Sequence, residues 1–337
     1  FVAFDPRLAM EPWVGAACRD AGVPIVAVES HAAIAALVAG GGFDTFFTPG
    51  LVAYAGLLDR LEGAAGRTRV VGTVHDIREV TLPEAGGPEG RGRADFARLF
   101  ASERIDTIVT VSEHSRREIL RVFGRPRPPL EVLAAPEKRR VEPEPFVWAG
   151  RDFATLDYAL VVSAGRPEKN AAAAVRAFDA LAGDPEAAAD LGDLQLVVAG
   201  VDTVADVAPV RHARRFVAVP PLPAERFESL LANCRFLIYP SLEEGFGYPP
   251  VEALRHGRPA IVSDTGAVRE VCGPAAIPCD PRSDAAIAAA IRRMLHDPIP
   301  PAVLARQSRR IAARQREDLG RFVGLLLARS LPGAAVS

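Results

Sequence analysis

Residues 239–271 read YPSLEEGFGYPPVEALRHGRPAIVSDTGAVREV. The apolar run RFLIYP that leads into this stretch predicts a strand. The Pro-Pro pair at 249–250 predicts the start of a helix, because proline suits a first helical turn. The loop EEGFG at residues 243–247 lies between them, and we expect Glu252 in the first turn of the helix. The stretch therefore predicts a strand, a glycine-rich loop and a helix, the repeating unit of a parallel α/β sheet.

The same alternation of strand and helix extends in both directions along the 337 residues. The predicted strands are FVAF, PIVAVES, FDTFFTP, RVVGTVHD and DTIVTVS in the first half and ALVVSAG, LQLVVAG, RFVAVP, RFLIYP and PAIVSD in the second. A chain of this length suits two α/β domains of roughly 150 residues each. Two facing parallel sheets place the loops at their strand ends around one cleft, where ligands bind.

A second junction of strand and helix, SAGRPEKN, carries positive charge. Gly165 allows close backbone approach, the helix N-terminus offers free N–H groups, and Arg166 and Lys169 add two cations. Lys138 and Lys169 are the only lysines among the 40 basic residues of the chain. The combination suits a diphosphate group. A solvated basic turn explains the same residues, so both interpretations stand at this point.

The glycine-rich loop before the Pro-Pro pair indicates a binding site for oxygens. Gly245 and Gly247 flank Phe246, an arrangement that exposes successive backbone N–H groups to anionic or hydroxyl oxygens. Glu244 and Glu252 are separated by seven residues, and carboxylates accept strongly from hydroxyls. A loop acid and an acid near a helix start are the alternative interpretation of the two glutamates. The glycines favour binding.

EEGFGYPPVEALRHGRPAIVSD resembles the E-x7-E signature of the GT4 family, retaining glycosyltransferases that have the GT-B fold. SAGRPEKN is similar to the diphosphate-binding strand and loop of that family, and TVSEHSRREI resembles the end of its N-terminal domain. The resemblance is strongest from Leu160 to Pro281. It implies two Rossmann-like, doubly wound parallel-sheet domains that face each other across a cleft. It also implies a bacterial enzyme of carbohydrate biosynthesis.

The resemblance implies roles for the cationic junction. Arg166 and Lys169, beside Gly165, bind the donor diphosphate and stabilise the leaving nucleotide. The two cations are three residues apart, closer than in many members of the family, which carry a longer loop.

The resemblance also implies how the donor is held at its other parts. Glu252 accepts from the ribose hydroxyls, and Glu244 hydrogen-bonds a hydroxyl of the donor sugar. The N–H groups around Gly245, Phe246 and Gly247 fix that sugar in place.

The N-terminal half contributes His75, at the end of the strand in RVVGTVHD. His75 is one of six histidines, and an ordinary loop histidine beside a capping Asp76 is the alternative interpretation. Family members keep a histidine after this strand, so the resemblance implies that His75 reaches the donor sugar from the acceptor side. The family's glycine-rich loop after the first strand has no counterpart in FVAFDPRLAMEPW, which contains no glycine.

We expect three parts in the chain: an acceptor-side Rossmann-like domain at 1–140, a nucleotide-sugar-binding Rossmann-like domain at 141–301 and a helical tail at 302–337. The segment RPRPPLEVLAAPEKRRVEPEPFVWAG is dense in proline and charge, which places the hinge near 136–150. The tail alternates arginine with apolar residues at helical spacing. We expect it to pack back across the domains, and a helix lying on a membrane surface is the alternative.

Composition narrows the function further. The net charge of −2 gives no overall basic field, so we expect no nucleic-acid partner. Cys18, Cys234, Cys272 and Cys279 form no CxxC pair, and we expect reduced thiols. No D-x-D, HExxH or GxxxxGK[ST] pattern occurs, so we expect activity without a metal or other cofactor. No apolar run reaches the roughly 20 residues that span a bilayer. We expect a cytoplasmic protein, with peripheral contact at the inner face of the membrane as an alternative.

The sequence therefore predicts a retaining glycosyltransferase that moves a hexose-type sugar from a nucleotide diphosphate sugar to a hydroxyl acceptor on a polysaccharide, glycolipid or natural product. We expect Glu244, His75, Arg166 and Lys169 to be the catalytic residues. Two alternatives remain open: a GT-B sugar-nucleotide epimerase, which turns over the donor alone, and a non-catalytic protein that binds a sugar nucleotide. No obvious carboxylate nucleophile is present, which favours a front-face route over double displacement.

Overall fold

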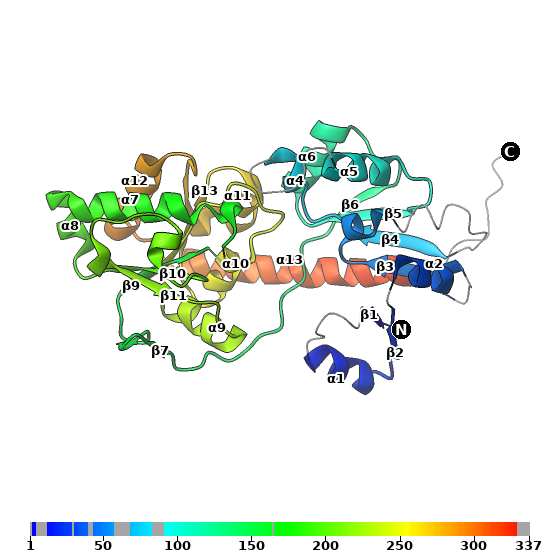
Figure 1. Ribbon diagram of the computed structural model, residues 1–337, viewed down its shortest axis with the longest axis horizontal. Coiled ribbons are helices and arrows are strands. Elements are labelled where there is room, and N and C mark those ends of the chain that lie inside the picture. The colour runs from blue at the N-terminus through cyan, green and yellow to red at the C-terminus, as the bar shows by residue number, and fades with distance from the viewer. Residues whose placement is uncertain are drawn as a thin grey trace.

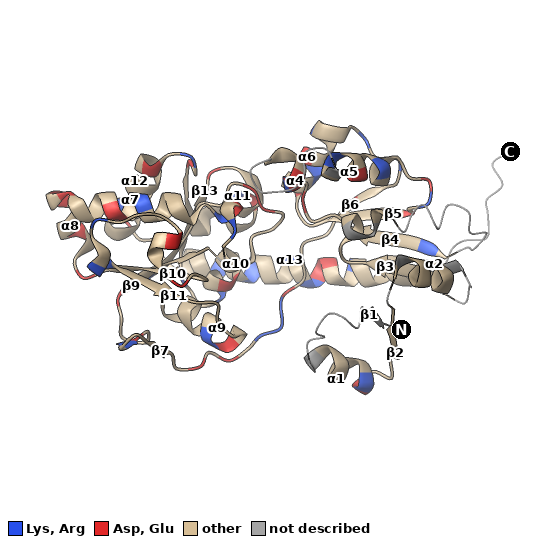
Figure 2. Cartoon of the chain, viewed as in Figure 1, with Lys and Arg blue, Asp and Glu red and all other residues tan. Residues whose placement is uncertain are grey.

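The protein is described by a computed structural model, shown in Figure 1, whose described residues are 2–4, 12–28, 30–39, 43–56, 68–82, 91–163 and 165–328. Two parallel sheets organise these residues, one of four strands in the first half and one of six strands in the second half. Helices cover the sheets, and both signs of charge are spread over both halves (Figure 2).

The C-terminal sheet is wholly parallel, and its strands lie in the order β11-β10-β9-β12-β13-β14. Its strands are β9 (Tyr158–Val162), β10 (Gln195–Ala199), β11 (Phe216–Val219), β12 (Phe236–Tyr239), β13 (Ala260–Ser263) and β14 (Ala276–Cys279). Counted along the chain, this is the 3-2-1-4-5-6 order of a doubly wound sheet, with a switch in winding direction between β9 and β12. The predicted α/β class is confirmed. The last strand, β14, was not predicted.

Helices pack on both faces of this sheet because its strands are apolar on both sides. One face is covered by α7 (Ala171–Gly183), α8 (Pro185–Leu191) and α12 (Asp284–His296), and the other by α9 (Ala224–Asn233), α10 (Tyr248–Arg255) and α11 (Gly266–Cys272). Strands β12 and β13 are buried along their whole length. The helices thereby leave the loops at the strand ends uncovered.

The N-terminal sheet is also parallel and has the strand order β3-β4-β5-β6. Its strands are β3 (Thr45–Thr48), β4 (Arg69–Thr73), β5 (Thr107–Thr110) and β6 (Leu130–Val132). The helical elements of this half are α1 (Pro12–Asp20), α2 (His31–Ala39), η1 (Leu51–Tyr54), α4 (Arg78–Thr81), α5 (Arg91–Ala101) and α6 (Glu113–Phe123). Strand β6 was not predicted, because its three residues lie in a segment whose proline and charge indicate a linker.

The first two strands, β1 (Val2–Phe4) and β2 (Ile25–Ala27), pair in parallel with each other. Residues 5–11, where the glycine-rich loop of the family would fall, lie outside the described residues. The segment predicted as the hinge, 136–150, runs without helix or strand until the two-residue strand β7 (Val147–Trp148), which pairs with β8 (Arg151–Asp152). The domain boundaries at residues 140 and 301 stay predictions.

The last helix, α13 (Pro301–Leu327), contacts both halves of the molecule (Figure 1). Near its start, Gln307 donates to the carbonyl of Val271 at 2.7 Å. Near its end, Phe322 packs edge-on against Phe47 of β3, with ring centroids 4.9 Å apart. One side of the helix is therefore buried against α10 and α11 of the C-terminal half and against β3 of the N-terminal half.

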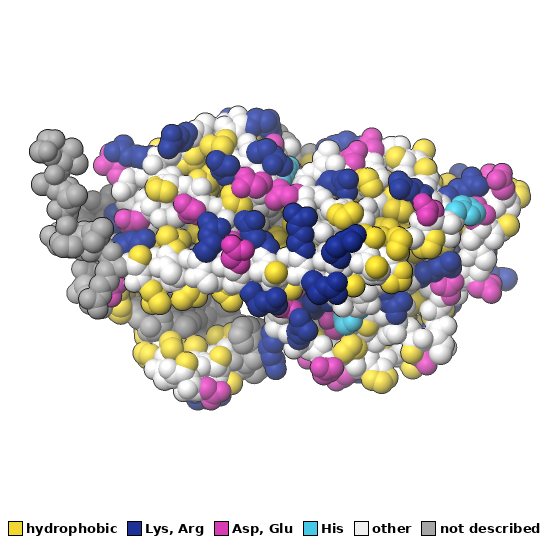
Figure 3. Space-filling model, turned by 180° about the vertical axis from the view of Figure 1, so that it is seen from behind, with side chains coloured by type: hydrophobic (Ala, Val, Ile, Leu, Met, Phe, Trp, Pro, Cys, Tyr) yellow, Lys and Arg dark blue, Asp and Glu magenta, His cyan; other side chains and the backbone are white. Residues whose placement is uncertain are grey.

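The outer side of α13 is strongly basic. Basic side chains gather near the middle of the face opposite to that of Figure 1, as Figure 3 shows. The exposed arginines of α13 are Arg306, Arg309, Arg310, Arg314, Arg316 and Arg321. None of the helices in the described ranges is long and apolar enough to cross a membrane.

The helix of the E-x7-E stretch begins earlier than predicted. α10 starts at Tyr248, directly after Gly247, whose φ of +87° turns the chain sharply into the helix. The two prolines then occupy the second and third helical positions, where no backbone N–H is required. The expectation that Glu252 lies in the first turn is therefore wrong, because it lies one turn deeper.

Candidate functional site

A cavity of about 470 Å³ lies between the two halves, at the carboxyl ends of strands from both sheets. Its lining comes from the ends of β3, β4, β5 and β6 on one side and of β9 and β12 on the other. Four basic side chains, Arg78, Lys138, Arg166 and Lys169, and three acidic ones, Asp76, Glu79 and Glu244, are among the lining residues. The volume is typical of a small-molecule site, and the position is where doubly wound sheets bind their ligands.

The structure brings together most of the residues that the sequence singles out. The predicted site residues that line the cavity are His75, Arg166, Lys169, Glu244, Gly245, Phe246 and Gly247. Gly165 and Glu252 are not among the lining residues. Gly165 stands one residue before Arg166 with a φ of +65°, and Glu252 lies behind Lys138.

Glu244 is held by three donors that converge on one oxygen. Its Oε1 accepts from Lys169 Nζ, from the hydroxyl of Tyr239 at 2.6 Å and from the hydroxyl of Ser241 at 2.9 Å. Lys169 also donates to the Tyr239 oxygen at 2.6 Å. The carboxylate is thereby fixed at the edge of the cavity by groups from the 3-10 helix Pro167–Lys169 that follows β9, from β12 and from the loop after β12.

Burial sets the electrostatics of this cluster. The side chain of Lys169 is 4% exposed, and burial lowers the pKa of its ammonium group although the charge of Glu244 opposes that effect. Burial, together with the Glu244 carboxylate, raises the pKa of Tyr239 well above its ordinary value, so the hydroxyl keeps its proton and donates. Tyr239 and Ser241 are partners that sequence reasoning did not identify.

Arg166 is more accessible than Lys169. Its side chain is 49% exposed, and its Nε lies 3.5 Å from a carboxylate oxygen of Glu168. Arg78, from α4 of the other half, lies 3.5 Å from the same oxygen. Two guanidinium groups from opposite sides of the cavity therefore meet at one buried carboxylate. Arg78 is a further cavity residue that the sequence did not reveal.

The EEGFG loop approaches the N-terminal half closely at Gly245. A β-carbon at this position would lie 2.5 Å from the carbonyl oxygen of His75, a separation too small for any side chain. That carbonyl also accepts from the Ser115 hydroxyl at 2.8 Å. Glycine is thus required here because two backbones meet across the cavity.

His75 lies on the N-terminal side of the cavity, as expected for a residue that ends its strand. Its Nε2 is 2.9 Å from the carbonyl oxygen of Pro49, and its side chain is exposed. The neighbouring Asp76 precedes the N-cap residue Ile77 and accepts from the backbone N–H of Arg78, the first residue of α4, at 3.2 Å.

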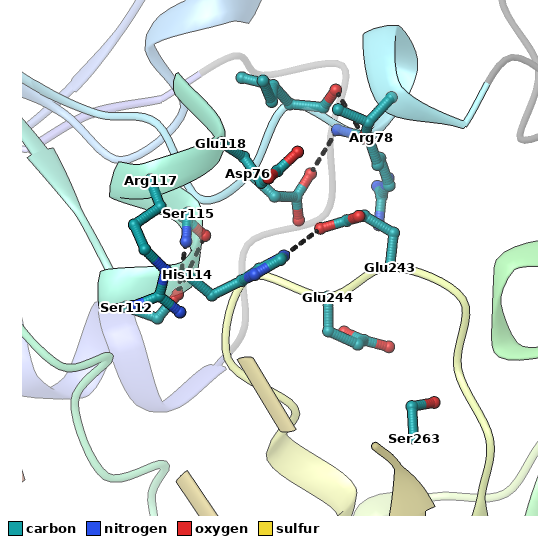
Figure 4. Close-up of polar contacts among 12 residues, drawn as sticks. Asp76, Arg78, Ser112, His114, Ser115, Arg117, Glu118, Glu243, Glu244 and Ser263 are labelled. Atoms are coloured by element: carbon teal, nitrogen blue, oxygen red, sulfur yellow. Dashed lines mark hydrogen bonds and ion pairs between the residues drawn. The ribbon is translucent and has the colours of Figure 1, made fainter. Parts of the chain in front are cut away.

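A histidine that was not singled out joins the two halves beside the cavity. Figure 4 shows His114, from α6, directed at Glu243, with Nε2 and Oε1 2.8 Å apart. The backbone N–H groups of Glu113 and His114 also donate to Glu270 of α11, at 3.0 and 2.8 Å. Burial opposes protonation of His114, but the hydrogen bond and charge of Glu243 outweigh it and raise its pKa above the ordinary value of 6.5.

Glu252 pairs with the other lysine of the chain. Lys138 Nζ lies 2.8 Å from Glu252 Oε1 and 4.5 Å from the centroid of the Tyr248 ring. The Glu252 side chain is 7% exposed, and its Oε2 is buried without a hydrogen-bond partner within the described residues. The sequence drew attention to Lys138 as a rare lysine but gave no indication of its partner.

Candidate metal ligands do not cluster in the described part of the chain: no group of three or more His, Cys, Asp or Glu residues there is arranged to hold a metal ion. The four cysteines are free and buried, at Cys18, Cys234, Cys272 and Cys279.

Two facing parallel sheets, with a charged cavity at their strand ends, define the architecture of a GT-B protein. Solved structures support the fold. The fold matches that of sucrose-phosphate synthase from Thermosynechococcus elongatus with a TM-score of 0.65 at 17% identity, over 88% of this chain and 77% of that one. It matches a UDP-forming trehalose-phosphate synthase from Burkholderia xenovorans with a TM-score of 0.65 at 12% identity, over 96% and 81%.

The family follows from residues 151–315, which match the model of the glycosyl transferases group 1; this part of the chain belongs to that family. The predicted family is confirmed for residues 151–315, and the solved structures confirm the predicted GT-B fold class.

Curated relatives share more of the sequence than the solved structures do. The chain is 29% identical over 257 residues to O-antigen chain mannosyltransferase B of Escherichia coli, covering 68% of this chain and 62% of the relative. It is 30% identical over 237 residues to the GDP-mannose-dependent alpha-(1-6)-phosphatidylinositol dimannoside mannosyltransferase of Mycobacterium tuberculosis, covering 67% and 57%. The chain thus spans less than two thirds of the length of these relatives.

Proposed function

We propose that this protein is a retaining glycosyltransferase that transfers a hexose from a nucleoside diphosphate sugar to a hydroxyl acceptor. The observation that carries the proposal is the convergence of Arg166, Lys169 and the Glu244 loop on one cavity between two sheets, in a domain of the glycosyl transferases group 1 family. The N-terminal half supplies the acceptor side in this proposal, and the C-terminal half binds the donor.

The charge and exposure of Arg166 support its role as the residue that binds the diphosphate. Its half-exposed guanidinium can turn toward an anion, whereas the Lys169 ammonium is buried against Glu244. Arg166 therefore makes the direct charge-assisted contacts with the diphosphate. The buried Lys169 adds positive charge to the site and holds Glu244. Glu252 accepts from the ribose hydroxyls through its unpartnered Oε2.

The three donors on Oε1 of Glu244 leave Oε2 to accept from a hydroxyl of the sugar. Backbone N–H groups around Phe246, between two glycines, hold the same sugar. His75 reaches it from the opposite side of the cavity. The sugar thus lies between the two sheets, beside the place where an acceptor enters.

The proposed reaction is a front-face displacement. The bond between the anomeric carbon and the phosphate oxygen breaks as the acceptor oxygen forms a bond on the same face. The acceptor proton passes to the leaving phosphate oxygen, so atoms and charge balance without an added base. Arg166 and the backbone dipoles stabilise the departing diphosphate, which makes electrostatic stabilisation the main contribution of the protein.

The names of the relatives indicate which donor to test first. Relatives from Escherichia coli and Mycobacterium tuberculosis are named as mannosyltransferases, and one of them is named as GDP-mannose-dependent. We therefore propose GDP-mannose as the first donor. We also propose that the protein is located in the cytoplasm.

A screen of nucleotide sugars by thermal shift, followed by an assay of nucleotide release, tests the proposal. A bound donor raises the unfolding temperature with its occupancy. We expect nucleoside diphosphate release that depends on an added acceptor alcohol, and a product whose anomeric proton has the donor's configuration by NMR. Conversion of the donor sugar without an acceptor indicates an epimerase, and binding without release indicates a non-catalytic protein. Either result overturns the proposal.

The same assay tests the proposal that no metal is required. Cations and backbone N–H groups at the diphosphate reduce the need for magnesium to neutralise the leaving group. We expect full activity in EDTA. Complete loss in EDTA, restored by magnesium or manganese, contradicts a metal-independent site.

A further inference from the structure

The segment between the two sheets is fastened along one face of α10. Three consecutive linker residues each contact a different residue of that helix. The Tyr248 hydroxyl donates to the carbonyl of Pro136 at 2.8 Å, Lys138 pairs with Glu252 at 2.8 Å, and Glu137 lies 3.8 Å from Arg255. Positions 248, 252 and 255 share one face of a helix because they are spaced by four and three residues.

Lys138 differs from its two neighbours because its partner is a buried carboxylate. Glu252 is 7% exposed, and a buried charge is unfavourable unless another charge and hydrogen bonds compensate it. Lys138 supplies that compensation at Oε1 only. Oε2 is buried and has no partner among the described residues, although buried acceptors in folded proteins are nearly always satisfied.

The ammonium also belongs to the cavity. Lys138 and Tyr248 both line it, and the Lys138 side chain is 49% exposed. The charge that compensates Glu252 is therefore held at the cavity wall, with the aromatic ring of Tyr248 beneath it at 4.5 Å. Lys138 lines the cavity, whereas its partner Glu252 does not.

We propose that Lys138 is a positioning residue for the nucleotide, supplied by the interdomain linker. It holds Glu252 through Oε1 and leaves Oε2 without a partner, so that Oε2 can accept from the ribose hydroxyls of a nucleoside diphosphate sugar. This inference rests on the proposed function and adds a linker residue to the donor site. It also explains why an acidic side chain is retained in a buried position with one oxygen unpaired.

Calorimetric binding of GDP and of 2′,3′-dideoxy-GDP tests the inference, with UDP and its dideoxy analogue as a second pair. We expect Lys138→Met to weaken the diphosphate with an intact ribose about tenfold, the size of one charge-assisted hydrogen bond. The dideoxy analogue lacks the hydroxyls from which Glu252 accepts hydrogen bonds. Lys138→Met should therefore change the affinity for this analogue by less than about twofold. Lys138→Arg should restore binding, and Lys138→Gln, the second neutral variant, should behave as Lys138→Met does.

Two further measurements separate positioning from a structural role. Lys138→Met should raise KM for the donor and leave kcat nearly unchanged, because Lys138 does not touch the sugar. In a Glu252→Gln background it should have no additional effect on GDP affinity. Arg140→Met is the matched control, because Arg140 lies in the same linker but pairs with Glu137 at 2.8 Å instead of α10.

Each outcome decides one idea. If the wild type binds neither GDP nor UDP, the proposed function fails, and this inference fails with it. Wild-type binding with unchanged affinity in Lys138→Met overturns the inference alone. Equal weakening of both analogues assigns Lys138 to the phosphates or to the fold and also overturns it. Tighter binding in Lys138→Met identifies the lysine as an obstacle to the ribose, contrary to the inference.

Discussion

The two lysines of the chain pair with the two glutamates of the E-x7-E stretch, but in different surroundings. Lys169 is 4% exposed, and its partner Glu244 also accepts from Tyr239 and Ser241. Lys138 is 49% exposed, comes from the linker and holds Glu252 alone. The first pair lies within one sheet and its loops, whereas the second pair joins that half to the segment that leads to the other half.

The difference between the two pairs indicates how the E-x7-E stretch divides sugar contact from ribose contact between Glu244 and Glu252. Both carboxylates are held through one oxygen and keep the other as an acceptor, but they differ in their donors. Three donors fix Glu244, which suits contact with a sugar whose charge changes during reaction. One half-exposed ammonium holds Glu252, which suits contact with a group whose charge does not change. The pair at Glu244 thus suits the chemical step, and the pair at Glu252 suits binding.

The largest expected difference between the pairs is in stability. Lys169→Met should lower the free energy of unfolding by about 3 kcal/mol or more, because it breaks a buried ion pair. Lys138→Met should lower it by less, about 1–2 kcal/mol. Solvent screens the half-exposed Lys138 ammonium, although the substitution leaves the Glu252 carboxylate buried without a partner charge. Urea unfolding midpoints measure both. Equal losses contradict the difference in burial, and the double variant Lys169→Met/Glu244→Gln should regain part of the loss because no unpaired charge remains.

The second prediction separates the glutamates by function. Glu244→Gln should leave GDP affinity within about twofold of the wild type and reduce kcat about 100-fold, because an interaction that strengthens in the transition state is lost. Glu252→Gln should weaken GDP and the intact sugar nucleotide by a similar factor of about ten. Calorimetry with both ligands, combined with kcat, checks the split. If Glu244→Gln weakens bare GDP as much as Glu252→Gln does, its sugar-side role is wrong.

The third prediction concerns Arg166, a half-exposed cation of the cavity that belongs to neither lysine–glutamate pair. Arg166→Ala should weaken GDP about 10- to 100-fold, the range of a charge-assisted contact. Arg176→Ala is the matched control: its side chain is also 49% exposed, but it pairs with Asp284 on the helical face of the sheet, away from the cavity residues. Calorimetry should show no change for the control. An unchanged affinity in Arg166→Ala would falsify the diphosphate role and favour a solvated basic turn.

Local sequence pattern was sufficient for the elements that carry the proposed donor site. Five of the six strands in the C-terminal sheet appear as apolar runs, and the strand-loop-helix order places Arg166, Lys169 and Glu244 at one edge, as the cavity confirms. The sixth strand, β14, was missed because AIPC contains a proline and sits at the sheet edge, where proline is tolerated.

Pairings across the fold were not predictable from the sequence. Lys169 and Glu244 are 75 residues apart. The SAGRPEKN and EEGFG segments indicate that the two residues bind one ligand, but not that they contact each other. The Lys138 pair depends on the path of a linker that has no periodic pattern. The helix start at Tyr248 depends on Gly247, whose positive φ is a property of the folded loop. These features follow from packing between distant segments, which residue spacing does not encode.

The smallest expected effect is a pH-dependent change in stability at the His114–Glu243 pair, next to Glu244. Because the pKa of His114 is raised in the folded protein, the folded state binds more protons than the unfolded state between the ordinary value of 6.5 and the raised one. The His114–Glu243 pair therefore stabilises the protein fully below that ordinary value and loses its effect as the pH rises through the raised pKa. His114→Gln should lower the unfolding free energy by about 1 kcal/mol at pH 6 and by much less at pH 9. Urea midpoints across this pH range measure the trend, and in a Glu243→Gln background the same substitution should have no pH-dependent effect. A loss in His114→Gln that grows with pH would show that protonation of His114 beside Glu243 does not stabilise the protein.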